Sequence, residues 1–94
     1  MTQVTVSKRH IDDGKCGSPK RCAVALAIRE HVKEGIYVCI EAGQVCFTSY
    51  TKADFSRRKL PIEASQFIER FDRMKSVEPI TFELDIPQDF LAVV

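Results

Sequence analysis

Four cysteines and two histidines are the side chains of this chain best suited to metal or nucleophilic chemistry. They are Cys16, Cys22, Cys39, Cys46, His10 and His31. A structural zinc site needs four such ligands, commonly with two of them in a tight Cys-x2-Cys turn. The spacings here are Cys-x5-Cys and Cys-x6-Cys, which are too loose to favour zinc. We therefore predict no metal or other cofactor, and keep a zinc-stabilised structural domain as an alternative.

A catalytic cysteine also needs a base within hydrogen-bond reach. Nothing in the sequence places His10 or His31 beside a thiol, and the chain has no phosphate-binding glycine loop, nucleophile elbow or metalloprotease motif. The adjacent carboxylates Asp12 and Asp13 precede Gly14, which is typical of a charged helix end. The sequence therefore predicts a protein that is not an enzyme and has no catalytic residue or small-molecule substrate.

Many of the lysines and arginines cluster at two predicted loops. Cations on loops meet phosphates easily, and arginine grips phosphate or carboxylate through two parallel hydrogen bonds. Most single surface cations are merely solvated, so the arginine run is the stronger candidate. The predicted binding residues are Lys15, Lys20 and Arg21 around the loop that opens the first predicted helix, and Arg57, Arg58 and Lys59 in the second loop.

Charge is unevenly distributed along the chain, although the formal net charge is only +1. Residues 1–60 carry eleven Lys and Arg against six Asp and Glu, whereas residues 61–94 carry three against seven. Such a chain can present one basic face and one acidic face. A dedicated nucleic-acid-binding domain is usually strongly basic. A small nucleic-acid-binding regulator is therefore the alternative interpretation of the basic clusters.

The length of 94 residues and the hydrophobic content of 45% fit one small domain over residues 1–94. No segment approaches the roughly 20 apolar residues of a membrane span. The N-terminus alternates between apolar and polar residues, unlike a signal peptide. We expect a cytoplasmic protein without membrane contact, whose cysteines are reduced.

Capping residues and apolar spacing predict two helices beside the basic loops. Ser18 is the expected N-cap of the first helix, with proline at its first position and Gly35 at its end. The second helix starts at Pro61 and carries an apolar stripe at intervals of three and four residues. A shorter helical turn is expected over residues 8–13.

Alternating apolar residues predict a mainly antiparallel sheet of three to five strands. A first strand contains Val4 and Val6, a last strand covers residues 80–86, and a short edge strand lies near residues 58–60. With two helices packed on one face of this sheet, the fold class is α+β. The apolar tail of residues 88–94 is expected either to dock on the body or to contact another chain.

A β-hairpin over residues 36–50 is predicted to turn at Ala42-Gly43. A two-residue turn places Cys39 opposite Cys46, whereas a three-residue turn with a bulge would shift the register. The core face would carry Ile36, Val38, Ile40, Val45 and Phe47. The other face would carry Tyr37, Cys39, Cys46, Thr48 and Tyr50. We expect a helix, the tail or a partner to cover that second face.

Three segments resemble a family of small phage and actinobacterial proteins. Residues 10–28 carry the pattern His-Ile-x-x-Gly followed by Cys-x-Val-Ala-Leu-Ala. Residues 60–72 read Leu-Pro-x-x-Ala-x-x-Phe-Ile-x-x-Phe-Asp, and residues 77–84 also fit. Most matching positions are packing or capping positions, so they indicate a shared fold. Small phage proteins of this kind include type I-F anti-CRISPR inhibitors, to which this chain is similar.

The resemblance implies stoichiometric inhibition of a type I-F CRISPR-Cas surveillance complex in the bacterial cytoplasm. The inhibitor would occupy the effector proteins, or the backbone of the guide RNA, and so exclude target DNA. The six predicted binding cations would contact guide-RNA phosphates. Facing the basic walls of the complex would be the acidic residues Glu63, Glu69, Asp72, Glu78, Glu83 and Asp85.

Overall fold

Two antiparallel sheets and three α-helices make up the part of the chain that the computed structural model describes, residues 1–49 and 55–92. In chain order the elements are β1 (Thr2–Val6), α1 (Lys8–Asp13), α2 (Ala23–Arg29), β2 (Ile36–Glu41), β3 (Gln44–Ser49), β4 (Phe55–Lys59), α3 (Ile62–Asp72), β5 (Ile80–Leu84) and a 3-10 turn, Gln88–Phe90. Strand β1 pairs with β5, and β2, β3 and β4 form the second sheet in that order. The predicted α+β class is confirmed, with the strands divided between two sheets.

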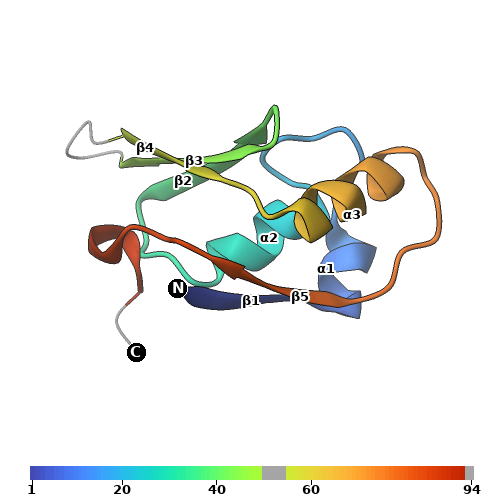
Figure 1. Ribbon diagram of the computed structural model, residues 1–94, viewed down its shortest axis with the longest axis horizontal. Coiled ribbons are helices and arrows are strands. Elements are labelled where there is room, and N and C mark those ends of the chain that lie inside the picture. Colours follow the sequence, from blue (N-terminus) through green and yellow to red (C-terminus); the bar gives the residue numbers. More distant parts are fainter. Residues whose placement is uncertain (50–54, 93–94) are drawn as a thin grey trace.

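Helix α2 lies between the two sheets (Figure 1). Its sequence explains this position, because apolar residues surround almost its whole circumference. Ala23, Val24, Ala25, Ala27 and Ile28 are all 0% exposed. The alanines allow close approach of the helix to its neighbours, and α2 contacts both β1 and β2.

The start of helix α2 differs from the sequence prediction. Cys22, and not Ser18, caps the helix. Residues 18–22 form a turn instead, and the carbonyl of Pro19 accepts a hydrogen bond of 2.9 Å from the backbone N–H of Ile40. The loop is thereby fixed to the edge of β2, and this long-range contact competes with an earlier helix start.

The loop between α1 and α2 is also held against α3. The thiol of Cys16 and the backbone N–H of Gly17 donate hydrogen bonds of 2.9 and 2.8 Å to the last two residues of α3. At the start of the loop, a Cβ on Gly14 would lie 2.7 Å from the backbone nitrogen of Ala23. Only glycine fits there without displacement of the chain, so this residue sets the distance between α1 and α2.

The hairpin of β2 and β3 has the predicted register. Ala42 and Gly43 have φ angles of 49° and 76°, as a two-residue type I′ turn requires. Cys39 therefore lies opposite Cys46. The inner face contains buried Val38, Ile40, Val45 and Phe47 and partly buried Ile36, as predicted. Tyr50, which the prediction placed at the end of this hairpin, lies outside the described residues.

Helix α3 starts directly after Pro61, as predicted, and packs against α2 and β5. Ala64, Phe67 and Phe71 form its buried stripe. Helix α3 has 11 residues, and no helix in residues 1–49 and 55–92 combines the length and apolar character that crossing a bilayer would need.

The tail docks on the body of the molecule through residues 88–92. Phe90 is 6% exposed, and its ring centre lies 6.2 Å from that of Phe47 on the inner face of β3. Of the two predicted alternatives, docking is therefore what these residues do. Residues 93–94 lie outside the described part of the chain.

Candidate functional site

The fold brings the two predicted basic clusters to opposite edges of one three-stranded sheet. The loop that carries Lys20 is fixed to β2 by the hydrogen bond between Pro19 and Ile40. The run from Arg57 to Lys59 lies in β4, on the other side of β3. Segments about 40 positions apart in the sequence therefore contribute cations to one surface.

A groove of about 410 Å³ lies where the end of α2 meets the start of β2. Its charged lining consists of four cations, Lys20, Arg21, Arg29 and Lys33, and one carboxylate, Glu34. We call this site the basic groove. Cations beside the C-terminal end of a helix are also favoured by the helix dipole.

Two cations of the basic groove, Arg29 and Lys33, were not among the predicted binding residues. In the sequence they belong to the polar end of a helix and carry no signal of their own. The chain turns at Gly35, whose φ of 86° favours glycine, and enters β2 beside them. The proximity of this turn to the loop carrying Lys20 and Arg21 could not be inferred from spacing alone.

The basic groove continues onto the sheet through Tyr37. The ammonium of Lys20 lies 5.1 Å from the centre of the Tyr37 ring, which is a cation–π distance. Tyr37 is 42% exposed and also lines the groove. The groove and the sheet therefore form one continuous surface at this residue.

The side of the β2-β3-β4 sheet that faces away from α2 is called the outer face here. The register places Tyr37, Thr48 and Phe55 in one row across the three strands. The next row consists of Cys39, Cys46 and Arg57, and Lys59 ends the face on β4. No described helix covers this face, and residues 88–92 dock on the inner side (Figure 1). The expectation that a helix or the tail covers it is therefore wrong for the described residues.

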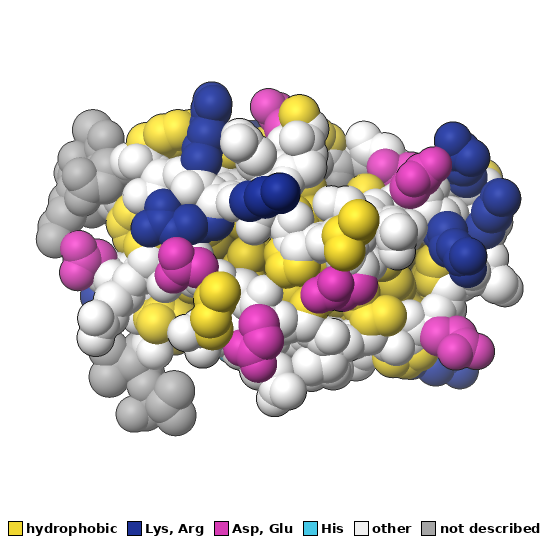
Figure 2. Space-filling view, viewed as in Figure 1, with side chains coloured by type: hydrophobic (Ala, Val, Ile, Leu, Met, Phe, Trp, Pro, Cys, Tyr) yellow, Lys and Arg dark blue, Asp and Glu magenta, His cyan; other side chains and the backbone are white. Residues whose placement is uncertain are grey.

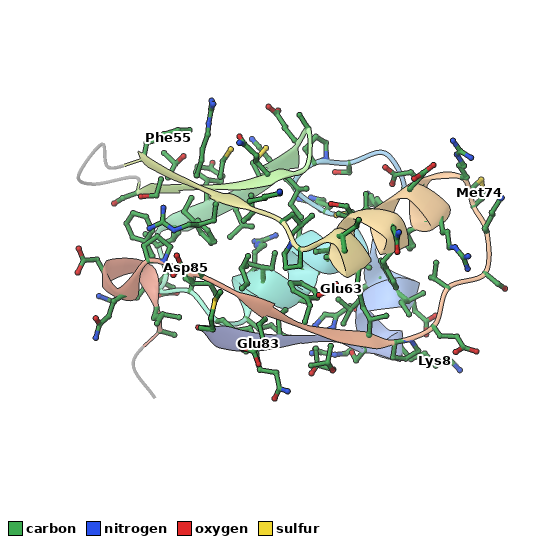
Figure 3. The ribbon with its side chains drawn as sticks, viewed as in Figure 1. Lys8, Phe55, Glu63, Met74, Glu83 and Asp85 are labelled. Atoms are coloured by element: carbon green, nitrogen blue, oxygen red, sulfur yellow. The ribbon has the colours of Figure 1, made fainter. Side chains whose placement is uncertain are left out.

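Among residues 1–49 and 55–92, Phe55 is the most exposed aromatic ring of the outer face. Its exposed fraction is 54%, and the ring lies on the side of β4 away from α2 (Figure 3). The guanidinium carbon of Arg57 lies 5.1 Å from the ring centre. Tyr37 and Phe55 thus each have a cation beside the ring, Lys20 and Arg57 respectively.

Arg58 and Lys15 lie apart from this surface. Side chains alternate along β4, so Arg58 points to the opposite side from Arg57. Its Nε lies 3.2 Å from Oδ2 of Asp85, and its guanidinium donates to the carbonyl of Arg57 at 2.9 Å. Lys15 is exposed and does not line the basic groove. Of the six predicted binding residues, the fold gathers four: Lys20, Arg21, Arg57 and Lys59.

The four cysteines are free thiols. The Sγ of Cys39 lies 3.8 Å from a carboxylate oxygen of Glu41. Burial, the negative charge of Glu41 and the neighbouring Cys46 together raise the pKa of the Cys39 thiol. A thiol held protonated in this way is a poor nucleophile. Within the described residues, no group of three or more His, Cys, Asp or Glu side chains is placed to hold a metal ion.

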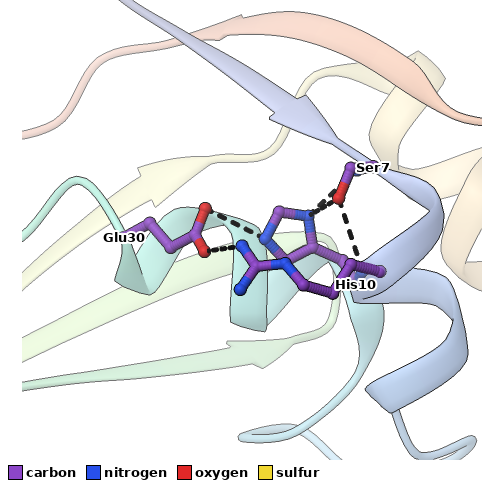
Figure 4. Close-up of polar contacts among 4 residues, drawn as sticks. Ser7, His10 and Glu30 are labelled. Carbon is purple, nitrogen blue, oxygen red and sulfur yellow. Dashed lines mark hydrogen bonds and ion pairs between the residues drawn. The ribbon is translucent and has the colours of Figure 1, made fainter.

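Ser7, His10 and Glu30 lie in series, in an order like that of a hydrolase triad (Figure 4). Ser7 Oγ is 3.0 Å from His10 Nδ1, and His10 Nε2 is 3.0 Å from Glu30 Oε1. However, His10 Nδ1 accepts the backbone N–H of Ser7, and Ser7 Oγ accepts that of His10. These reciprocal bonds are a capping box at the start of α1. Ser7 does not line the hollow beside His10, so the arrangement is that of a helix cap.

Glu30 fixes this cap to the end of α2. Partial burial by itself would raise its pKa. Hydrogen bonds from His10 and Arg9 outweigh that effect and hold the pKa of Glu30 below its ordinary value of 4.5. The ionised carboxylate is therefore the form that the folded protein stabilises.

A second groove, of about 760 Å³, lies between α3 and the segment leading to β5. We call it the α3 groove. Its charged lining consists of Glu63, Glu69, Glu78, Arg70, Arg73 and Lys75. Glu69 and Arg73 form an ion pair of 3.1 Å, and both signs of charge occur at this end of the molecule (Figure 2). The three acidic residues of the α3 groove therefore do not form a purely acidic surface.

Comparisons with known protein families, with curated proteins and with solved structures found no match. The resemblance of residues 10–28, 60–72 and 77–84 to anti-CRISPR inhibitors stays a prediction. Functional interpretation of this chain therefore depends on the geometry of its surfaces.

Proposed function

We propose that the protein acts by stoichiometric binding, as a phage-encoded inhibitor of an RNA-guided type I-F surveillance complex in the bacterial cytoplasm. The observation that carries this proposal is the basic groove. Lys20 and Arg21 from one loop converge there with Arg29 and Lys33 from the end of α2. A surface with four cations and one carboxylate complements an array of phosphates.

Within such a complex, the guide RNA is the component that a basic groove complements. The protein channels that hold guide and target are themselves positively charged and would repel it. The α3 groove, in which acids and cations balance, offers no acidic surface for those channels. Binding of this protein to the backbone of the guide RNA would exclude target DNA. Charge complementarity would accelerate association of the protein with the complex.

The test is target-DNA binding by a purified, guide-loaded type I-F complex titrated with this protein. We expect target binding to fall to zero once about one molecule of this protein has been added for each of its binding sites on the complex. The double variant Arg29→Glu/Lys33→Glu should lose most of this inhibition, whereas Arg73→Glu/Lys75→Glu in the α3 groove makes the same charge change and should retain it. Undiminished target binding at a tenfold excess of the wild-type protein would refute the proposal.

A further inference from the structure

We infer that the basic groove and the outer face together form a binding site for single-stranded nucleic acid. The groove would hold phosphates, and the exposed rings of the outer face would stack on bases. This inference rests on the proposed function in one respect, because it names the component of the complex that is contacted. It can nevertheless be tested on isolated strands.

The outer face has the features of a base-stacking platform. Phe55 and Tyr37 are 54% and 42% exposed and belong to one row across the sheet, separated by Thr48. Neighbouring strands lie about 4.8 Å apart, so the backbones carrying the two rings are about 10 Å apart. Single strands bind to open sheets of this kind by stacking their bases on aromatic rings.

Cations lie beside both exposed rings, within reach of the phosphates of a strand that crosses the outer face. Lys20 and Arg57 lie 5.1 Å from the centres of the two rings, and Lys59 follows Arg57 on the same side of β4. The remaining groove cations continue the path beyond Tyr37. The site therefore combines stacking surfaces with a basic track, which are the two components of single-strand recognition.

A double helix does not fit this combination. Its bases are stacked on one another and present only their edges, so the exposed rings would gain no partner. A duplex could still contact the cations, but only through its backbone. Preference for a single strand is thus the property that separates this site from a simple electrostatic patch.

The decisive experiment measures fluorescence anisotropy with a labelled 15-nucleotide uridine RNA, the matching thymidine DNA and a 15-base-pair RNA duplex. We expect the single strands to bind at least about tenfold more tightly than the duplex at equal salt. Loss of one stacked base weakens binding by about five- to a hundredfold, and Phe55→Ala should fall in this range. Phe55 is a surface residue, so this variant should retain the unfolding midpoint of the wild type.

Charge reversal tests the basic track with a matched control. Lys33→Glu should weaken single-strand binding at least about tenfold, whereas Lys75→Glu in the α3 groove should change it less than about twofold. With four to six phosphates contacted, the logarithm of the binding constant should fall with the logarithm of salt at a slope of about −3 to −4. Equal affinity for duplex and single strand, or unchanged binding by Phe55→Ala, would overturn the inference.

The two nucleic-acid arms identify the source of the strand. Tighter binding to RNA indicates the guide, and tighter binding to DNA indicates a displaced target strand. Inhibition of the surveillance complex is measured separately and decides the proposed function. A protein that binds single strands but leaves the surveillance complex active keeps this inference and loses the proposed function. A protein that inhibits the complex without binding either strand keeps the proposed function and loses this inference.

Discussion

The basic groove and the α3 groove show how differently a fold can use the charges of its chain. The basic groove gathers cations from a loop, a helix end and a turn, with one carboxylate among four cations. The α3 groove draws on the most acidic part of the sequence, yet it contains three acids and three cations. There acids and cations lie together on α3 and the segment after it and neutralise one another, as Glu69 and Arg73 do at 3.1 Å. The net charge of a segment therefore does not determine the charge of the surface that it forms.

The largest effect is expected from Gly14→Ala, because Gly14 packs against the start of α2, the helix whose other end contributes Arg29 to the basic groove. Its Cβ would lie 2.7 Å from backbone of Ala23 and 2.9 Å from backbone of His10. Overpacking against backbone costs about 1–3 kcal/mol of unfolding free energy, to be measured by urea denaturation. Gly17→Ala is the comparison variant, because its φ is 72° and its surroundings are open. Gly17→Ala therefore measures backbone strain without a clash, and a Gly14→Ala variant as stable as the wild type would mean that close packing at Gly14 is unimportant.

The second-largest effect is expected on the binding of a polyanion, which should depend on the basic groove and not on the α3 groove. Arg21→Glu/Lys33→Glu should lower affinity for heparin at least about tenfold, because two of the four groove cations are reversed. Arg73→Glu/Lys75→Glu makes the same change in net charge in the α3 groove and should have a much smaller effect. Isothermal titration calorimetry at two salt concentrations provides the measurement. Equal losses in the two double variants would mean that binding follows net charge and not the groove.

A smaller effect is expected at the edge of the basic surface, where Arg57 and Arg58 occupy opposite sides of β4. Arg58→Ala removes the ion pair with Asp85 and should reduce the unfolding free energy by about 1 kcal/mol or less, since both side chains are partly exposed. Arg57→Ala should instead leave stability unchanged and weaken binding of single strands. Thermal unfolding and anisotropy on both variants check this division. A reversed pattern would contradict the assignment of Arg57 to the binding surface.

The smallest effect concerns the pH dependence of the cap that holds α1 against α2. The folded state lowers the pKa of Glu30, so its stabilising contribution is present above the ordinary value of 4.5 and is lost as pH falls through the folded pKa. The difference in unfolding free energy between wild type and Glu30→Gln should therefore shrink from pH 6 to pH 3. Glu78→Gln controls for the loss of one negative charge. A difference that is constant with pH would mean that the ionised carboxylate is not what stabilises the cap.

Much of the fold was predictable from local sequence signals. The Ala42-Gly43 turn determined the hairpin register, and hence the pairing of Cys39 with Cys46. The start of α3 followed from Pro61 and the apolar stripe after it. The start of α2 was mispredicted because Ser18-Pro19 is a good local helix start, whereas the hydrogen bond from a distant strand to the Pro19 carbonyl is invisible in the sequence.

The candidate site was predictable only in part, for the same reason. The basic loops were found, but the contribution of Arg29 and Lys33 depends on how α2 turns into β2. For Arg58 the sequence contained a usable signal. Had residues 55–59 been assigned to a strand, alternation alone would have placed Arg57 and Arg58 on opposite sides. Arg57 on the outer face could therefore be distinguished from Arg58, which pairs with Asp85, only with the extent of β4 known.

The position of α2 between the sheets has a consequence for how the molecule opens. Strands β1 and β5 form a two-stranded sheet from opposite ends of the described chain, and such a pair is at best marginally stable by itself. Helix α2 packs against both sheets, so loss of either sheet would expose the apolar helix that the other sheet also covers. Amide protons of both sheets should therefore exchange with solvent through one shared global unfolding event.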